Sequence, residues 1–94
     1  MFRITTTTIE PDQKLLKAEG AVRGEAVRAI RLACQLELAE GRPVVLDLTG
    51  VSFIDPAGVH CVRSLAAQGV QLRGGSPFVV AMLGESAFES NQNV

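Results

Sequence analysis

The sequence predicts a single small α/β domain, with a mixed and mostly parallel sheet of about four strands and helices packed on it. Three observations lead to this fold class. The spacing of apolar residues changes several times along the chain between the period of a strand and that of a helix. Glycine and proline mark the boundaries between these segments, and 94 residues are enough for one core only. The predicted element order is β-β-α-β-α-β-α, and strands that alternate with helices are typical of parallel sheets.

Composition favours a folded protein and excludes two classes of partner. Hydrophobic residues make up 47% of the chain and charged residues 20%, unlike disordered chains. The net charge of -1 offers no long-range attraction for nucleic acid, so we expect no nucleic-acid partner. The N-terminus lacks the apolar region of a signal peptide, and the longest apolar run, Phe78 to Leu83, is far shorter than the ~20 residues of a membrane span. We expect a cytoplasmic protein without membrane insertion.

The first two elements form a predicted hairpin. Residues Phe2 to Ile9 alternate with period two and are rich in β-branched side chains, which is typical of a strand. Pro11 and Asp12 form a turn. Lys14 to Val22 then alternate again, so a second strand follows.

A long amphipathic helix and a buried strand come next. From Glu25 to Glu40 apolar residues recur every three or four positions, with charged residues opposite them. Gly41 is placed as the C-terminal cap, and Pro43 stops the helix from continuing. The run Val44 to Leu48 is dominated by branched apolar residues, as expected for the central strand of a sheet.

The second helix has a clear start. Asp55 is a typical N-cap, Pro56 suits the first helical position, and Gly69 follows the end. Val70 to Arg73 is a brief strand, and Ser76-Pro77 repeats the start signal for a third helix that runs to about Leu83.

The C-terminal helix is apolar around nearly its whole circumference, so one domain does not obviously cover it. A homodimer through this helix, a partner protein or deep packing against the sheet would each bury it. We place the domain at residues 1–84 and expect residues 85–94 to be a loose tail.

No constellation of residues typical of an enzyme or a metal site is found. His60 and Ser64 lie one turn apart on the second helix, yet no nucleophile elbow or oxyanion donors accompany them, which favours a solvated histidine. Asp47 is expected to hydrogen-bond to loop amides. Cys34 and Cys61 form no ligand cluster and are expected to be buried thiols. We therefore expect no catalysis, no cofactor and no metal.

Residues 43–62, PVVLDLTGVSFIDPAGVHCV, resemble the STAS family, which includes anti-sigma-factor antagonists and the cytoplasmic domains of sulfate transporters. The matching segments are Asp47-Leu48-Thr49-Gly50 and Asp55-Pro56-Ala57-Gly58, and weaker resemblance covers most of the chain. The resemblance implies a STAS-like fold and a regulatory protein-binding module whose partner is an anti-sigma factor or a related protein. In the family's antagonists, phosphorylation of a hydroxyl in the Asp-x-x-Gly loop ends binding.

This chain has no hydroxyl at that place, because Pro56 and Ala57 stand between Asp55 and Gly58. Our hypothesis is a docking surface held in its unmodified form. It comprises Asp55, Pro56, Ala57, Gly58 and His60, with Ser52 to Ile54 shaping its base. Neither Ser52, at the strand end, nor Ser64, two turns into the helix, is a convincing substitute for the missing hydroxyl. The alternatives are a domain that senses a small molecule or nucleotide near the same helix start, and a structural subunit of a larger assembly.

Overall fold

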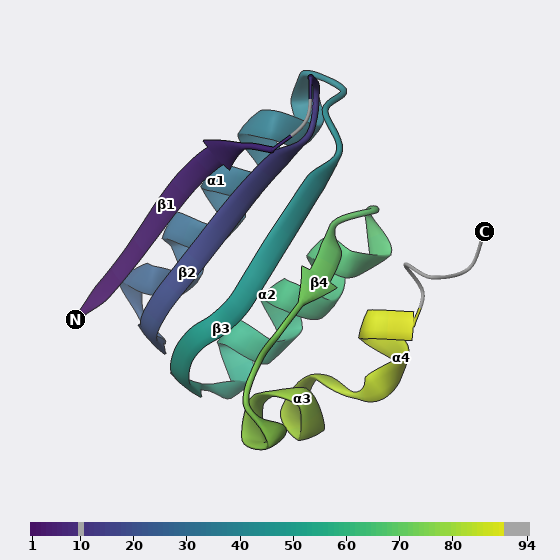
Figure 1. The fold of residues 1–94 in the computed structure, drawn as a ribbon. Coiled ribbons are helices and arrows are strands. Elements are labelled where there is room, and N and C mark those ends of the chain that lie inside the picture. Colours follow the sequence, from purple (N-terminus) through teal and green to yellow (C-terminus); the bar gives the residue numbers. More distant parts are fainter. Residues whose placement is uncertain (10, 90–94) are drawn as a thin grey trace.

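The computed structural model describes residues 1–9 and 11–89, and within them one four-stranded sheet and four helices (Figure 1). The sheet has the strand order β1-β2-β3-β4. The elements are β1 (Phe2–Thr8), β2 (Lys14–Val22), α1 (Glu25–Ala39), β3 (Val44–Ile54), α2 (Pro56–Ala67), β4 (Gln71–Arg73), α3 (Pro77–Leu83) and α4 (Glu85–Glu89). The order matches the predicted one as far as α3.

The sheet is mixed and mostly parallel, as the sequence predicted. β1 pairs antiparallel with β2, while β2 with β3 and β3 with β4 are parallel. Helices α1 and α2 lie together on one face of the sheet, the far face in Figure 1. The core lies between these two layers and is buried. Its largest fully buried members are Leu16, Ile30, Leu46, Leu48, Ile54, Leu65 and Leu83.

Strand β3 is longer than the predicted Val44 to Leu48 and continues to Ile54. The exposed residues Thr49 and Gly50 hid this continuation, because they interrupt the apolar pattern. Beyond them Val51 and Ile54 are buried and pair with Gly20 and Val22 of β2. Asp47 therefore lies inside the strand and not at its end.

Helix α3 buries one side only. Val79 and Leu83 are fully buried against the core, whereas Phe78 and Met82 are 47% and 41% exposed. The apolar helix thus packs on the domain and still leaves two large side chains uncovered. A homodimer through them remains a proposal.

Residues 85–89 form helix α4, which corrects the expectation of loose chain for this segment. Gly84 ends α3 with a positive φ of 90°, and the partly buried Ala87 and Phe88 then pack on the core. The rest of the expected tail, residues 90–94, lies outside the described residues, and the domain boundary at residue 84 stays a prediction.

None of the helices in the described ranges combines the length and the apolar character needed to cross a lipid bilayer.

Candidate functional site

The carboxyl ends of the parallel strands β2 and β3 meet at one edge of the sheet, which we call the carboxyl edge. Arg23 directly follows β2 and Asp55 directly follows β3. The amide of Asp55 donates a hydrogen bond of 3.1 Å to the carbonyl of Val22, which ties these two strand ends together. In open α/β sheets, ligands bind outside the carboxyl ends of the strands. The predicted docking residues begin at this edge.

Asp55 is the N-cap of α2, as predicted. Its Oδ1 accepts a hydrogen bond of 2.7 Å from the amide of Gly58, and its carbonyl accepts one of 2.8 Å from the amide of Val59. Pro56 occupies the first helical position, where its missing N–H costs nothing. One carboxylate oxygen is thus engaged in holding the loop.

Gly58 is buried because the start of α2 lies directly on two strands. A Cβ at this position would lie 2.9 Å from side-chain carbons of both Val22 and Ile54 and 3.1 Å from the carbonyl oxygen of Val22. These distances are shorter than van der Waals contact, so only glycine lets the helix approach this closely. The glycine of the Asp-x-x-Gly segment therefore has a steric reason in this chain.

Pro56, Ala57 and His60 are exposed around the helix start, as a docking surface requires. Ser52 is also exposed but lies within β3. Ser64 accepts a hydrogen bond of 3.3 Å from the side chain of Gln68, and no hydrogen bond joins it to His60 in the described part of the chain. The geometry brings together the predicted loop but forms no catalytic pair.

An aromatic cluster at the carboxyl edge was missed by the sequence analysis. The rings of Phe53 and Phe78 stack with centroids 6.3 Å apart at an interplanar angle of 18°, and the Arg23 guanidinium lies 5.9 Å from the Phe53 centroid. Phe53 and Phe78 are 40% and 47% exposed. No local sequence signal indicates this cluster, because its members come from distant segments: Arg23 follows β2, Phe53 lies in β3 and Phe78 lies in α3. We call these three residues the aromatic cluster.

Asp47 has a structural role inside β3. Its Oδ1 accepts a hydrogen bond of 2.9 Å from the amide of Thr49, and its Oδ2 lies 3.7 Å from Nη2 of Arg73. Burial alone would raise the pKa of this carboxyl group, but the hydrogen bonds from Thr49 and the charges of Arg73 and Lys17 together lower it. An ionised, hydrogen-bonded carboxylate of this kind is a poor general base.

Cys34 and Cys61 are free thiols buried between α1 and α2, as expected. Burial raises the pKa of Cys34 to about 12 and also raises that of Cys61. Neither thiol is a reactive nucleophile at neutral pH. Within the described residues no three His, Cys, Asp or Glu side chains are grouped to hold a metal ion.

Solved structures with a similar fold include two anti-sigma factor antagonists. One is SpoIIAA in its unphosphorylated form, with a TM-score of 0.69 and 20% identity over 94% of this chain and 84% of that one. The other, from Mycobacterium paratuberculosis, has a TM-score of 0.75 and 13% identity over 99% of this chain and 96% of that one. At these identities the likeness concerns the fold.

A segment of Mglu is also similar, with a TM-score of 0.57 and 28% identity over 78% of this chain. This chain spans only 19% of the length of Mglu. No curated protein matches the sequence. The family model described as "Mlab, STAS domain" matches residues 5–90. Since this match covers nearly the whole chain, the protein belongs to the STAS domain family.

Proposed function

We propose that this STAS domain is a cytoplasmic, non-catalytic regulatory module that binds an anti-sigma factor or a related regulatory protein through its carboxyl edge. The observation that carries the proposal is the aromatic cluster beside the exposed start of α2. Two stacked phenylalanine rings, 40% and 47% exposed, lie together at the surface of the domain. Exposed aromatic side chains of this kind are enriched at protein interfaces.

The docking surface is already organised before a partner arrives. Ring stacking holds Phe53 against Phe78, and the Asp55 cap with the tight Gly58 contact fixes the backbone of the loop. Binding then costs little conformational entropy at these positions, which favours affinity. Arg23 adds a positive charge next to the rings, so an acidic group on the partner would complement it.

The same surface lacks the usual means of being switched off. SpoIIAA is known in both an unphosphorylated and a phosphorylated form. In this chain the exposed positions between Asp55 and Gly58 are Pro56 and Ala57, and neither carries a hydroxyl. A phosphate would bring about -1.5 to -2 charges to this surface. Its exclusion supports a module held in its binding-competent state.

The test is co-purification of the tagged protein from its own cells, with bound proteins identified by mass spectrometry. The variant Ala57→Asp introduces a negative charge at the loop, where the N-terminus of α2 tolerates it well. Ala67→Asp is the matched control, because it places the same exposed change at the far end of the same helix. Loss of an anti-sigma factor or related regulator with Ala57→Asp but not with Ala67→Asp supports the proposal.

A second variant separates the two parts of the surface. Phe78→Ala removes an exposed ring of the aromatic cluster and leaves the start of α2 unchanged. We expect this variant to lower the affinity for the same partner tenfold or more, as for an aromatic hot spot. A partner that binds equally well to both Ala57→Asp and Phe78→Ala would use another surface. The chain would then be better described as a structural subunit.

A further inference from the structure

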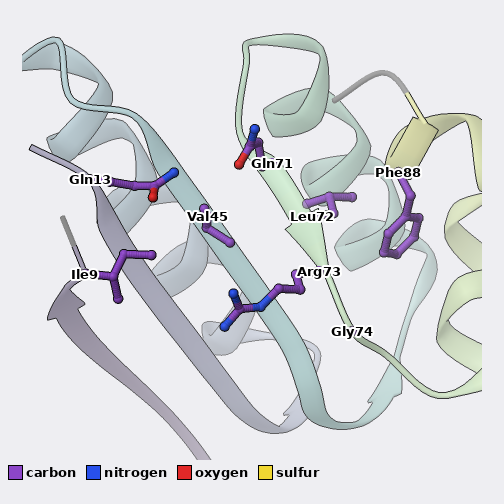
Figure 2. A pocket seen from close by; sticks show the side chains of 8 residues that line it. All are labelled: Ile9, Gln13, Val45, Gln71, Leu72, Arg73, Gly74 and Phe88. Carbon is purple, nitrogen blue, oxygen red and sulfur yellow. The ribbon is translucent and has the colours of Figure 1, made fainter. Parts of the chain in front are cut away.

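A groove of about 470 Å³ lies away from the carboxyl edge, on the face of the sheet that α1 and α2 leave uncovered (Figures 1 and 2). It begins at the β1–β2 hairpin with Ile9 and Gln13, crosses Val45 at the start of β3, and reaches β4 and Phe88 of α4. The amide of Ile9 donates a hydrogen bond of 3.0 Å to the carbonyl of Gln13, which closes the hairpin and places both side chains at the groove. This volume is in the range of small-molecule sites.

The apolar side chain of Val45 forms the floor of the groove. Successive strand residues point to opposite faces, so Val45 faces away from the core that contains Val44 and Leu46. Val45 is nevertheless only 5% exposed, which places it at the bottom of the groove. The Phe88 ring lies at one end and Ile9 at the other (Figure 2). An apolar floor with an aromatic side chain at its end suits an aromatic ring.

Three polar side chains converge on this floor. Figure 2 shows Gln13 and Gln71 on either side of Val45, while the Arg73 guanidinium extends across β3. The side-chain amides of Gln13 and Gln71 make no hydrogen bond to any residue in the ranges 1–9 and 11–89 and are free to bind a ligand.

Within the described residues Arg73 makes no side-chain hydrogen bond, and its ion pair with Asp47 is long at 3.7 Å. Its side chain is 57% exposed. By contrast, Arg3 contacts Glu19 at 3.0 Å and Arg42 contacts Glu40 at 2.6 Å. A guanidinium offers five donors in a planar fork that matches a carboxylate.

We propose that this groove binds a small aromatic carboxylate. Its carboxylate pairs with Arg73, its ring lies on Val45 next to Phe88, and polar ring substituents hydrogen-bond to Gln13 and Gln71. The site shares no residue with the carboxyl edge, so this proposal and the proposed function succeed or fail separately.

The test is a titration of the full chain with 2-naphthoate, followed by amide and side-chain chemical shifts in ¹H–¹⁵N NMR spectra. We expect saturable shifts at Gln13, Val45 and Gln71. Arg73→Gln should weaken binding tenfold or more, because a charge-assisted bidentate contact is lost. The uncharged probe 2-naphthamide should bind the native protein more weakly than 2-naphthoate by a similar factor.

Two further variants test whether the loss of affinity is specific to the Arg73 guanidinium. Arg73→Lys keeps the charge but not the fork, so an intermediate loss is expected, and the spectrum itself reports whether each variant is folded. Arg63→Gln removes an exposed arginine from α2 and should leave the affinity unchanged. Absence of saturable shifts, shifts that cluster at the carboxyl edge, or equal binding to Arg73→Gln would each overturn the proposal.

Discussion

Replacing Gly58 by alanine sets two physical effects against each other, and the sign of the result decides between them. Helix propensity alone predicts that Gly58→Ala stabilises the protein by about 0.5–1 kcal/mol. Packing predicts the opposite, because the new Cβ would lie 2.9 Å from Val22 and Ile54 carbons and 3.1 Å from a backbone oxygen. Val22 and Ile54 are buried β-branched residues with little rotamer freedom, so the helix itself must move.

Overpacking of this kind costs roughly 1–3 kcal/mol, and contact with backbone argues for the upper end. After the propensity gain is subtracted, we expect a net destabilisation of about 2 kcal/mol. For a domain of this size that corresponds to a fall in Tm of roughly 8–16 °C. Thermal unfolding followed by circular dichroism measures it.

The neighbouring variant Ala57→Gly is the control for propensity. Ala57 is exposed in the same helical turn, so its replacement by glycine should lower the free energy of unfolding by only about 0.5–1 kcal/mol. If Gly58→Ala proved as stable as the native protein or more stable, the close approach of α2 to β2 and β3 would not be the reason for glycine here.

Three further predictions concern the cap, an acidic group and the thiols. Asp55→Ala should lower the free energy of unfolding by about 1 kcal/mol in urea titrations while Asp55→Ser retains most of it, since the serine hydroxyl also caps. Folding lowers the pKa of Asp47 from 3.8, so the ionised carboxylate stabilises the folded state above about pH 4, and this stabilisation is lost as the pH falls through the folded pKa. Asp47→Asn should therefore flatten the fall in the free energy of unfolding below about pH 4. An acid unfolding profile that does not change in Asp47→Asn would argue against this role. Cys34 and Cys61 should resist a thiol reagent at pH 8 until the protein is unfolded in denaturant, and rapid labelling of the native protein would contradict their burial.

The elements that the sequence predicted well are those with a local physical signal. The Asp55 cap with Pro56 fixed the start of α2, and Ser76 likewise caps α3 by accepting a hydrogen bond of 3.2 Å from the amide of Val79. In both cases the determining contacts span only three residues. Hydrophobic periodicity similarly gave the strands of the hairpin and the long helix α1.

What the sequence analysis missed depends on contacts between distant segments. Strand β3 continues past Thr49 and Gly50 because β2 lies alongside it, and no local pattern contains that information. The stack of Phe53 on Phe78 likewise exists only once β3 and α3 meet at the carboxyl edge. Helix α4 is short and rests on the core through Phe88, so its stability comes from packing and not from its own sequence.

The residues of the Asp-x-x-Gly loop differ in what they contribute to the fold. Asp55 and Gly58 hold the architecture, whereas Pro56 and Ala57 face solvent and are free of such constraints. Under the proposed function, a single substitution to serine or threonine at either position would add a phosphorylation site and leave the Asp55 cap and the Gly58 contact in place. The same scaffold would then act as a reversible switch instead of a permanently active module.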